Sequence, residues 1–80
     1  MFFEFDRLNE FMNAIADVKC KKYYYVIELE DYAIVRAIAQ STKNTYAIEI
    51  IVDYEKLENT LNLLDVNGFI KTKTIKGWEG

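Results

Sequence analysis

Two stretches of the 80-residue chain carry apolar side chains at intervals of three and four residues, the spacing of a helix that buries one face. The first predicts a helix over residues 6–19, with Asp6 placed to cap its N-terminus. The second predicts a helix over residues 54–66, preceded by Asp53 as its cap. Asn67-Gly68 ends this second helix, because glycine readily takes the left-handed conformation that stops a helix.

Strand-forming residues fill most of the chain between the two predicted helices. Residues 23–30, 32–40 and 45–53 are rich in Tyr, Ile and Val, and short polar segments separate them. They predict three antiparallel strands joined by two hairpins, with two-residue turns at Glu30-Asp31 and Lys43-Asn44.

The two ends of the chain carry weaker strand signals. Residues 2–5, Phe-Phe-Glu-Phe, form either an extra edge strand or a lead-in that packs on the first helix. In the tail FIKTKTIKGW, residues 69–78, lysines are interspersed with isoleucine and threonine, as in an edge strand protected from aggregation. Trp78 in that tail either anchors a partner or folds back over the core.

These elements follow one another in the order α-β-β-β-α-β, without a linker or an internal repeat. The chain is therefore predicted to be a single domain over residues 1–80. The fold class is α+β, a two-layer sandwich in which a mainly antiparallel sheet carries both helices on one face.

Strand alternation divides the three consecutive tyrosines between the two faces of the predicted sheet. Tyr23 and Tyr25 point to one face and Tyr24 to the other, because successive side chains of a strand alternate. The Tyr24 face is rich in alanine, so the helices can approach closely there. The opposite face carries the candidate partner-binding residues Tyr23, Tyr25, Tyr32, Ile34, Arg36, Ile38, Glu49 and Ile51. Arg36 and Glu49 are predicted to form a diagonal ion pair near its middle.

Two interpretations of this apolar face stay open. If it is exposed, it is a contact surface, because contiguous exposed apolar patches mark interaction sites, and Tyr and Arg are enriched at interface hot spots. If a second layer covers it, or the sheet curls over itself, the same residues are ordinary core. Register decides between the faces, since a one-residue slip in either hairpin exchanges them for a whole strand.

Composition and charge narrow the function classes. Ten basic and thirteen acidic side chains give a net charge of −3, which disfavours direct binding to nucleic acid unless lysines gather locally. The chain has no histidine, the commonest general base and metal ligand, so we predict no enzymatic activity, no cofactor and no metal.

The cysteine content and the length of the apolar runs bear on the cellular location. Cys20 is the single cysteine, so no intramolecular disulfide forms, and the cytoplasm is the expected location. The apolar runs are too short to span a membrane.

The sequence therefore predicts a small, acidic, non-enzymatic protein-protein interaction module. Tyr23, Tyr25, Tyr32 and Arg36 anchor the contact, and flanking acids steer it toward a basic surface of a larger, nucleic-acid-processing partner. An inhibitor encoded by a virus or mobile element, such as an anti-CRISPR protein, fits this description, although no motif carries that last step.

Two other classes remain alternatives. In the first, the protein binds single-stranded nucleic acid, with Tyr23 and Tyr25 stacking on bases. Phosphates would then contact the flanking lysines Lys21, Lys22, Lys71 and Lys73. In the second, the chain is a structural homodimer that closes over the tyrosine face.

Overall fold

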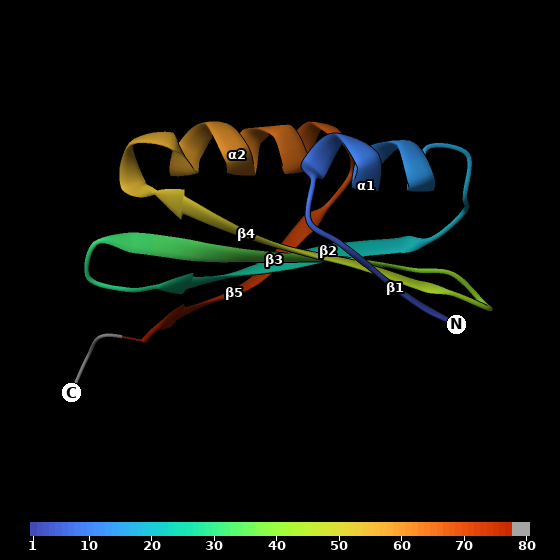
Figure 1. The fold of residues 1–80 in the computed structure, drawn as a ribbon, viewed down its shortest axis with the longest axis horizontal. Helices are drawn as coiled ribbons and strands as arrows, with labels where there is room; N and C mark the ends of the chain where they lie inside the picture. Colours follow the sequence, from blue (N-terminus) through green and yellow to red (C-terminus); the bar gives the residue numbers. More distant parts are fainter. Residues whose placement is uncertain (78–80) are drawn as a thin grey trace.

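A computed structural model describes residues 1–77 and has two layers, a five-stranded sheet and two helices that both cover one of its faces (Figure 1). The elements follow the chain as β1 (Phe2–Phe5), α1 (Leu8–Ile15), β2 (Lys21–Glu28), β3 (Tyr32–Gln40), β4 (Thr45–Asp53), α2 (Tyr54–Val66) and β5 (Ile70–Lys76). The α+β class is confirmed, and residues 2–5, left undecided by the sequence, form a strand.

The strands lie in the order β1-β4-β3-β2-β5, and the sheet is mixed. The two central pairings, β2 with β3 and β3 with β4, are antiparallel hairpins, whereas β1 pairs parallel to β4 and β5 parallel to β2. Each helix carries the chain back along the sheet, so the strand after a helix runs in the same direction as the strand before it. Because β2 and β4 run in the same direction, this return makes both edge pairings parallel, and β3 is central because it pairs with both β2 and β4.

The second helix has its predicted bounds and the first is shorter than predicted. At α2, the Asp53 side chain accepts a hydrogen bond from the Lys56 backbone nitrogen at 3.1 Å. Gly68 ends that helix region with a φ of 89°. The cap predicted at Asp6 is wrong, because the N-cap residue of α1 is Arg7, whose side chain makes no capping hydrogen bond. Helix α1 ends at Ile15, where the chain turns toward β2.

The first hairpin has the predicted turn, and the second has a different one. The Leu29 nitrogen donates to the Tyr32 carbonyl at 2.9 Å, which closes the turn at residues 30–31. In the second hairpin, the Ser41 nitrogen donates to the Asn44 carbonyl at 2.8 Å, so the central residues are 42–43. The Asn44 nitrogen also donates to the Ser41 hydroxyl at 2.9 Å, which favours this turn over the predicted Lys43-Asn44 turn.

The changed turn leaves the faces of the sheet unaltered. It shifts the β3–β4 pairing by two residues, and an even shift keeps every side chain on its predicted face. The shift does change neighbours: Arg36 lies directly opposite Glu49 and not diagonal to it. Strand β2 also begins and ends two residues earlier than predicted, with Lys21 opposite Gln40.

The hydrophobic core lies between the helices and the Tyr24 face of the sheet, as predicted. Alanines at the centre of β3 are fully buried and let the helices approach the sheet closely. Phe11 of α1 and Leu64 of α2 fill the space above them. The buried residues are Phe11, Ile15, Tyr24, Val26, Ala33, Val35, Ala37, Ala39, Ile48, Val52, Leu64 and Phe69.

Tyr24 links the core to α2, and its ionisation makes the stability of the fold fall with rising pH in the alkaline range. Its hydroxyl donates to Asp65 Oδ1 at 2.8 Å, and burial first, then this hydrogen bond, raises the pKa of Tyr24 from 10.0 to about 12. The neutral phenol is thus stabilised in the folded state, and this contribution is complete below pH 10 and is lost as the pH rises through about 12.

We expect the free energy of unfolding to fall across this interval by about 2 kcal/mol more in the natural protein than in Tyr24→Phe. Urea unfolding of both proteins, followed by circular dichroism below pH 10 and near pH 12, measures the difference. Equal pH dependence in the two proteins would contradict the role of this phenol, since other groups titrate in both.

Candidate functional site

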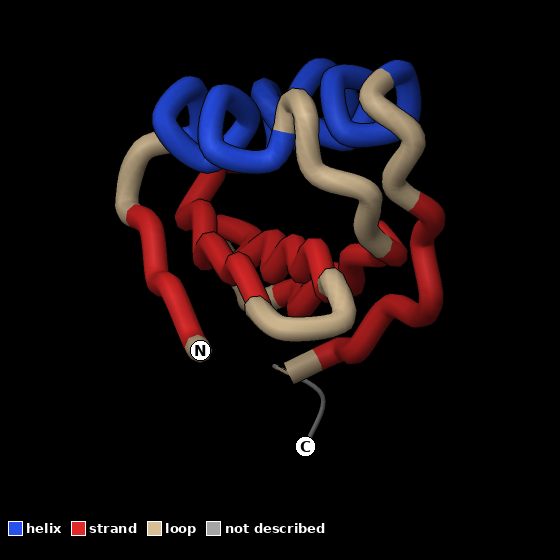
Figure 2. The backbone as a smooth tube through the Cα atoms, turned by 90° about the vertical axis from the view of Figure 1, so that its right-hand side faces the viewer, coloured by secondary structure: helices blue, strands red, loops and turns tan. Residues whose placement is uncertain are grey.

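The sheet face that points away from the helices, called the open face from here on, is formed by alternate residues of all five strands. In the end-on view of Figure 2, the edge strands β1 and β5 slope away from the helix layer on either side of the central strands. All the predicted partner-binding residues lie on this face: Tyr23 and Tyr25 on β2, Tyr32, Ile34, Arg36 and Ile38 on β3, and Glu49 and Ile51 on β4. Their role in binding remains a prediction.

No helix or strand within residues 1–77 covers the open face, so the alternative in which these residues are ordinary core does not describe this part of the chain. The exposed fraction of Ile51 is 69% and that of Tyr32 is 40%. The inner residues are half-buried by their neighbours on the sheet. At the edges, Phe2 and Ile70 extend the same apolar surface, with exposed fractions of 62% and 69%.

A row of three polar groups crosses the middle of the open face. Arg36 is the central residue of the central strand, and Tyr25 and Glu49 lie opposite it on either side. Arg36 donates through Nε to Glu49 Oε2 at 3.0 Å, through Nη2 to the same oxygen, and through Nη1 to the Tyr25 hydroxyl at 2.7 Å. The bonds to Glu49 and then to Tyr25 raise the pKa of Arg36 above its ordinary value. The centre of the open face is therefore charged, but its positive and negative groups, Arg36 and Glu49, are paired with each other.

A β-bulge at Thr72 places one lysine beside this row. The pairing of β5 with β2 shifts between Tyr24 and Tyr25, so Lys73 and not Thr72 lies opposite Tyr25. The Lys73 Nζ atom lies 5.5 Å from the centre of the Tyr25 ring. Bulges commonly redirect a side chain in this way, and here the bulge adds a cation to the open face.

The lysines proposed for single-stranded nucleic acid are divided between the two sides of the sheet. Lys21 and Lys73 share the open face with the tyrosines. Lys22 instead donates to the Asn67 carbonyl at 3.3 Å, at the end of α2. Lys71 lines a hollow beside α2 together with Asp65. This alternative therefore keeps two of its four cations on the binding face.

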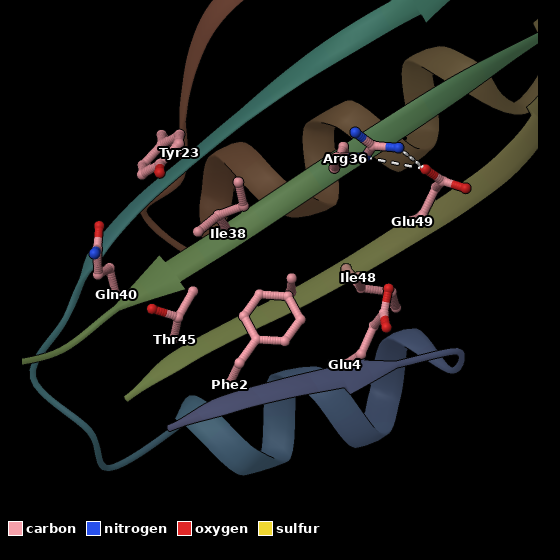
Figure 3. Close-up of a pocket in the computed structure, with 10 residues that line it drawn as sticks. Phe2, Glu4, Tyr23, Arg36, Ile38, Gln40, Thr45, Ile48 and Glu49 are labelled. Carbon is pink, nitrogen blue, oxygen red and sulfur yellow. Dashed lines mark hydrogen bonds and ion pairs between the residues drawn. The ribbon is translucent and has the colours of Figure 1, made fainter. Parts of the chain in front are cut away.

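Between β1 and β3 the open face has a hollow of about 380 Å³ (Figure 3). It forms because Ala47 of β4 is small, while its direct neighbours, Glu4 on β1 and Ile38 on β3, are larger. Its lining residues are Phe2, Glu4, Tyr23, Arg36, Ile38, Gln40, Thr45, Ala47, Ile48 and Glu49.

Phe2, Glu4 and Ala47 were not among the predicted binding residues, although alternation along residues 45–53 predicts Ala47 on the same face as Glu49 and Ile51. The segment 2–5 could not be assigned as a strand, and its residues meet β4 only through a pairing distant in sequence. The available signal was its alternation, which directs Phe2 and Glu4 to one face and Phe3 and Phe5 to the other.

Within residues 1–77 no group of three or more Cys, Asp or Glu side chains is placed to hold a metal ion. Neither of the helices described is long and apolar enough to cross a membrane. Trp78 lies outside the residues that the structure describes. In comparisons with known proteins, no family model matches the chain, and none of the curated proteins searched matches its sequence.

Proposed function

We propose that this protein is a non-catalytic protein-interaction module whose open face docks on a larger protein partner. One observation carries the proposal: no helix or strand within residues 1–77 covers the open face, which presents tyrosines and isoleucines around Arg36. Five strands of four to nine residues, about 4.8 Å apart and rising about 3.3 Å per residue, cover roughly 600 Å². A typical specific interface buries about 800 Å² on each partner, so this face supplies about three quarters of such an area.

A different protein fits the open face better than a second copy of the chain does. A two-fold dimer that used the whole face would place its axis through the centre, and Arg36 of one copy would then meet Arg36 of the other. Each Arg36 is already paired with its own Glu49, so the contact would desolvate two ion pairs and bring their like charges together, which opposes association. The structural homodimer is therefore the weaker candidate.

The acidic groups around the open face favour a basic partner surface. Glu30 and Asp31 form the exposed turn at one end of the face, and Asp53 lies at the same end of β4. Such carboxylates accelerate encounter with a positively charged surface, as found on proteins that process nucleic acid. An inhibitor from a virus or mobile element, acting in the cytoplasm by occluding that surface as anti-CRISPR proteins do, is the role we propose.

Site-specific crosslinking in cells that naturally make the chain tests the docking face. A photoreactive residue at Ile51, on the open face, is expected to link to a protein other than this chain. The same residue at Val66, equally apolar, 80% exposed and on α2, is expected not to. Light scattering on the purified chain should return the monomer mass of 9.4 kDa.

Two results would contradict the proposal. Equal crosslinking from both positions would mean that contact is unspecific. A dimer in light scattering whose only crosslinks from Ile51 are to a second copy would favour the homodimer.

A further inference from the structure

The hollow between β1 and β3 combines an apolar floor with a carboxylate rim. Ala47 and Ile38 are among its apolar lining residues, and Phe2 adds an aromatic ring, which lies between Thr45 and Glu4 in Figure 3 and is 62% exposed. Figure 3 shows Glu4 and Glu49 on the same side of the hollow, with Arg36 beside Glu49. A ligand with an apolar stem and a polar head would contact both parts.

The side chains that line the hollow carry a summed charge of −1, since Glu4 and Glu49 are negative and Arg36 is positive. Arg36 directs two of its donors to one oxygen of Glu49, Oε2, and a third to Tyr25. Among the described residues none donates a hydrogen bond to Glu49 Oε1, so this oxygen can accept one from a ligand. Glu4 makes no ion pair within residues 1–77. The hollow therefore has the charge to accept one cation.

From this lining we infer that the hollow binds the side chain of an arginine on the partner protein. The inference rests on the proposed function and specifies its partner. A guanidinium group forms paired hydrogen bonds with carboxylates and stacks on aromatic rings, here Phe2, whereas a lysine ammonium is more strongly hydrated. The aliphatic stem would lie over Ala47 and Ile38, as long cationic side chains lie over apolar surface elsewhere. A volume of about 380 Å³ is within the range of small-ligand sites.

Titration with N-acetyl-arginine amide, followed by the amide chemical shifts of the protein, tests the site without the partner. Saturable shifts are expected at Phe2, Glu4, Ala47 and Glu49, with a dissociation constant of ~1 mM for so small a ligand. N-acetyl-citrulline amide has nearly the same shape and no charge, and it should produce no saturable shift at these residues.

Matched variants separate the hollow from general electrostatics. Glu4→Gln is expected to weaken arginine binding about three- to fivefold, the effect of one exposed ion pair. Glu58→Gln, an equal change of charge on exposed α2, should leave binding unchanged. Glu4 is exposed and joins β4 through its backbone, so neither variant alters the fold.

Several results would overturn the inference: equal binding of arginine and citrulline, equal loss in the two variants, or no saturable shift. None of them depends on crosslinking from Ile51, which tests the docking face itself. The hollow can thus fail as an arginine site while the open face stands as an interface.

Discussion

Replacing Phe11 with alanine is expected to remove about 3–5 kcal/mol of the free energy of unfolding, a large share of the total. The exposed fraction of Phe11 is 0%, and its ring lies between those of Phe5 and Phe69, at centroid distances of 5.7 and 5.8 Å. A domain of this length has a total stability of about 4–12 kcal/mol, so the variant should be partly or wholly unfolded at room temperature.

Urea unfolding followed by circular dichroism measures this loss. Leu63→Ala is the control, because Leu63 lies on α2 with 43% of its surface exposed, and it should cost less than about 1 kcal/mol. A loss below about 1.5 kcal/mol for Phe11→Ala would contradict the packing of α1 between β1 and residue 69.

Alternation along β2, β3 and β4 was sufficient to predict which of their residues share the open face. A period of two survives errors in turn position as long as the register shifts by an even number of residues, and the second hairpin shifted by two. The same pattern divided Tyr23 and Tyr25 from Tyr24 correctly. Helix α2 was predictable because its cap, Asp53, and its terminal Gly68 act within a few residues of the helix.

Features that depend on distant segments were not predictable in this way. Strand β1 is only four residues long and is held by its parallel pairing with β4, more than forty residues away. The hollow at Ala47 exists because of that pairing, so Phe2 and Glu4 could not be assigned to it. The bulge that brings Lys73 to Tyr25 likewise arises from the meeting of β5 with β2 and has no local sequence signal.

Aspartate substitutions at two adjacent positions of β3 are expected to lower the stability of the protein by very different amounts. Ala37 is fully buried beneath the helices, opposite Tyr24 on β2 and Ile48 on β4. Ala37→Asp places a carboxylate there without a partner, at a cost of about 4 kcal/mol or more, and should unfold the protein. Ile38→Asp lies on the open face, where water can reach the carboxylate, and should cost about 1–2 kcal/mol.

Circular dichroism and urea unfolding of the two variants decide whether the faces are assigned correctly. A folded Ala37→Asp together with an unfolded Ile38→Asp would mean that the helices cover the other face.

The folded Ile38→Asp variant also tests partner binding, because Ile38 lines the hollow together with Arg36. Losing the apolar contact at this central position should strongly reduce crosslinking from Ile51, since central residues carry most of the binding energy of an interface. If crosslinking persists in this variant, the partner contacts the rim of the open face and not its centre.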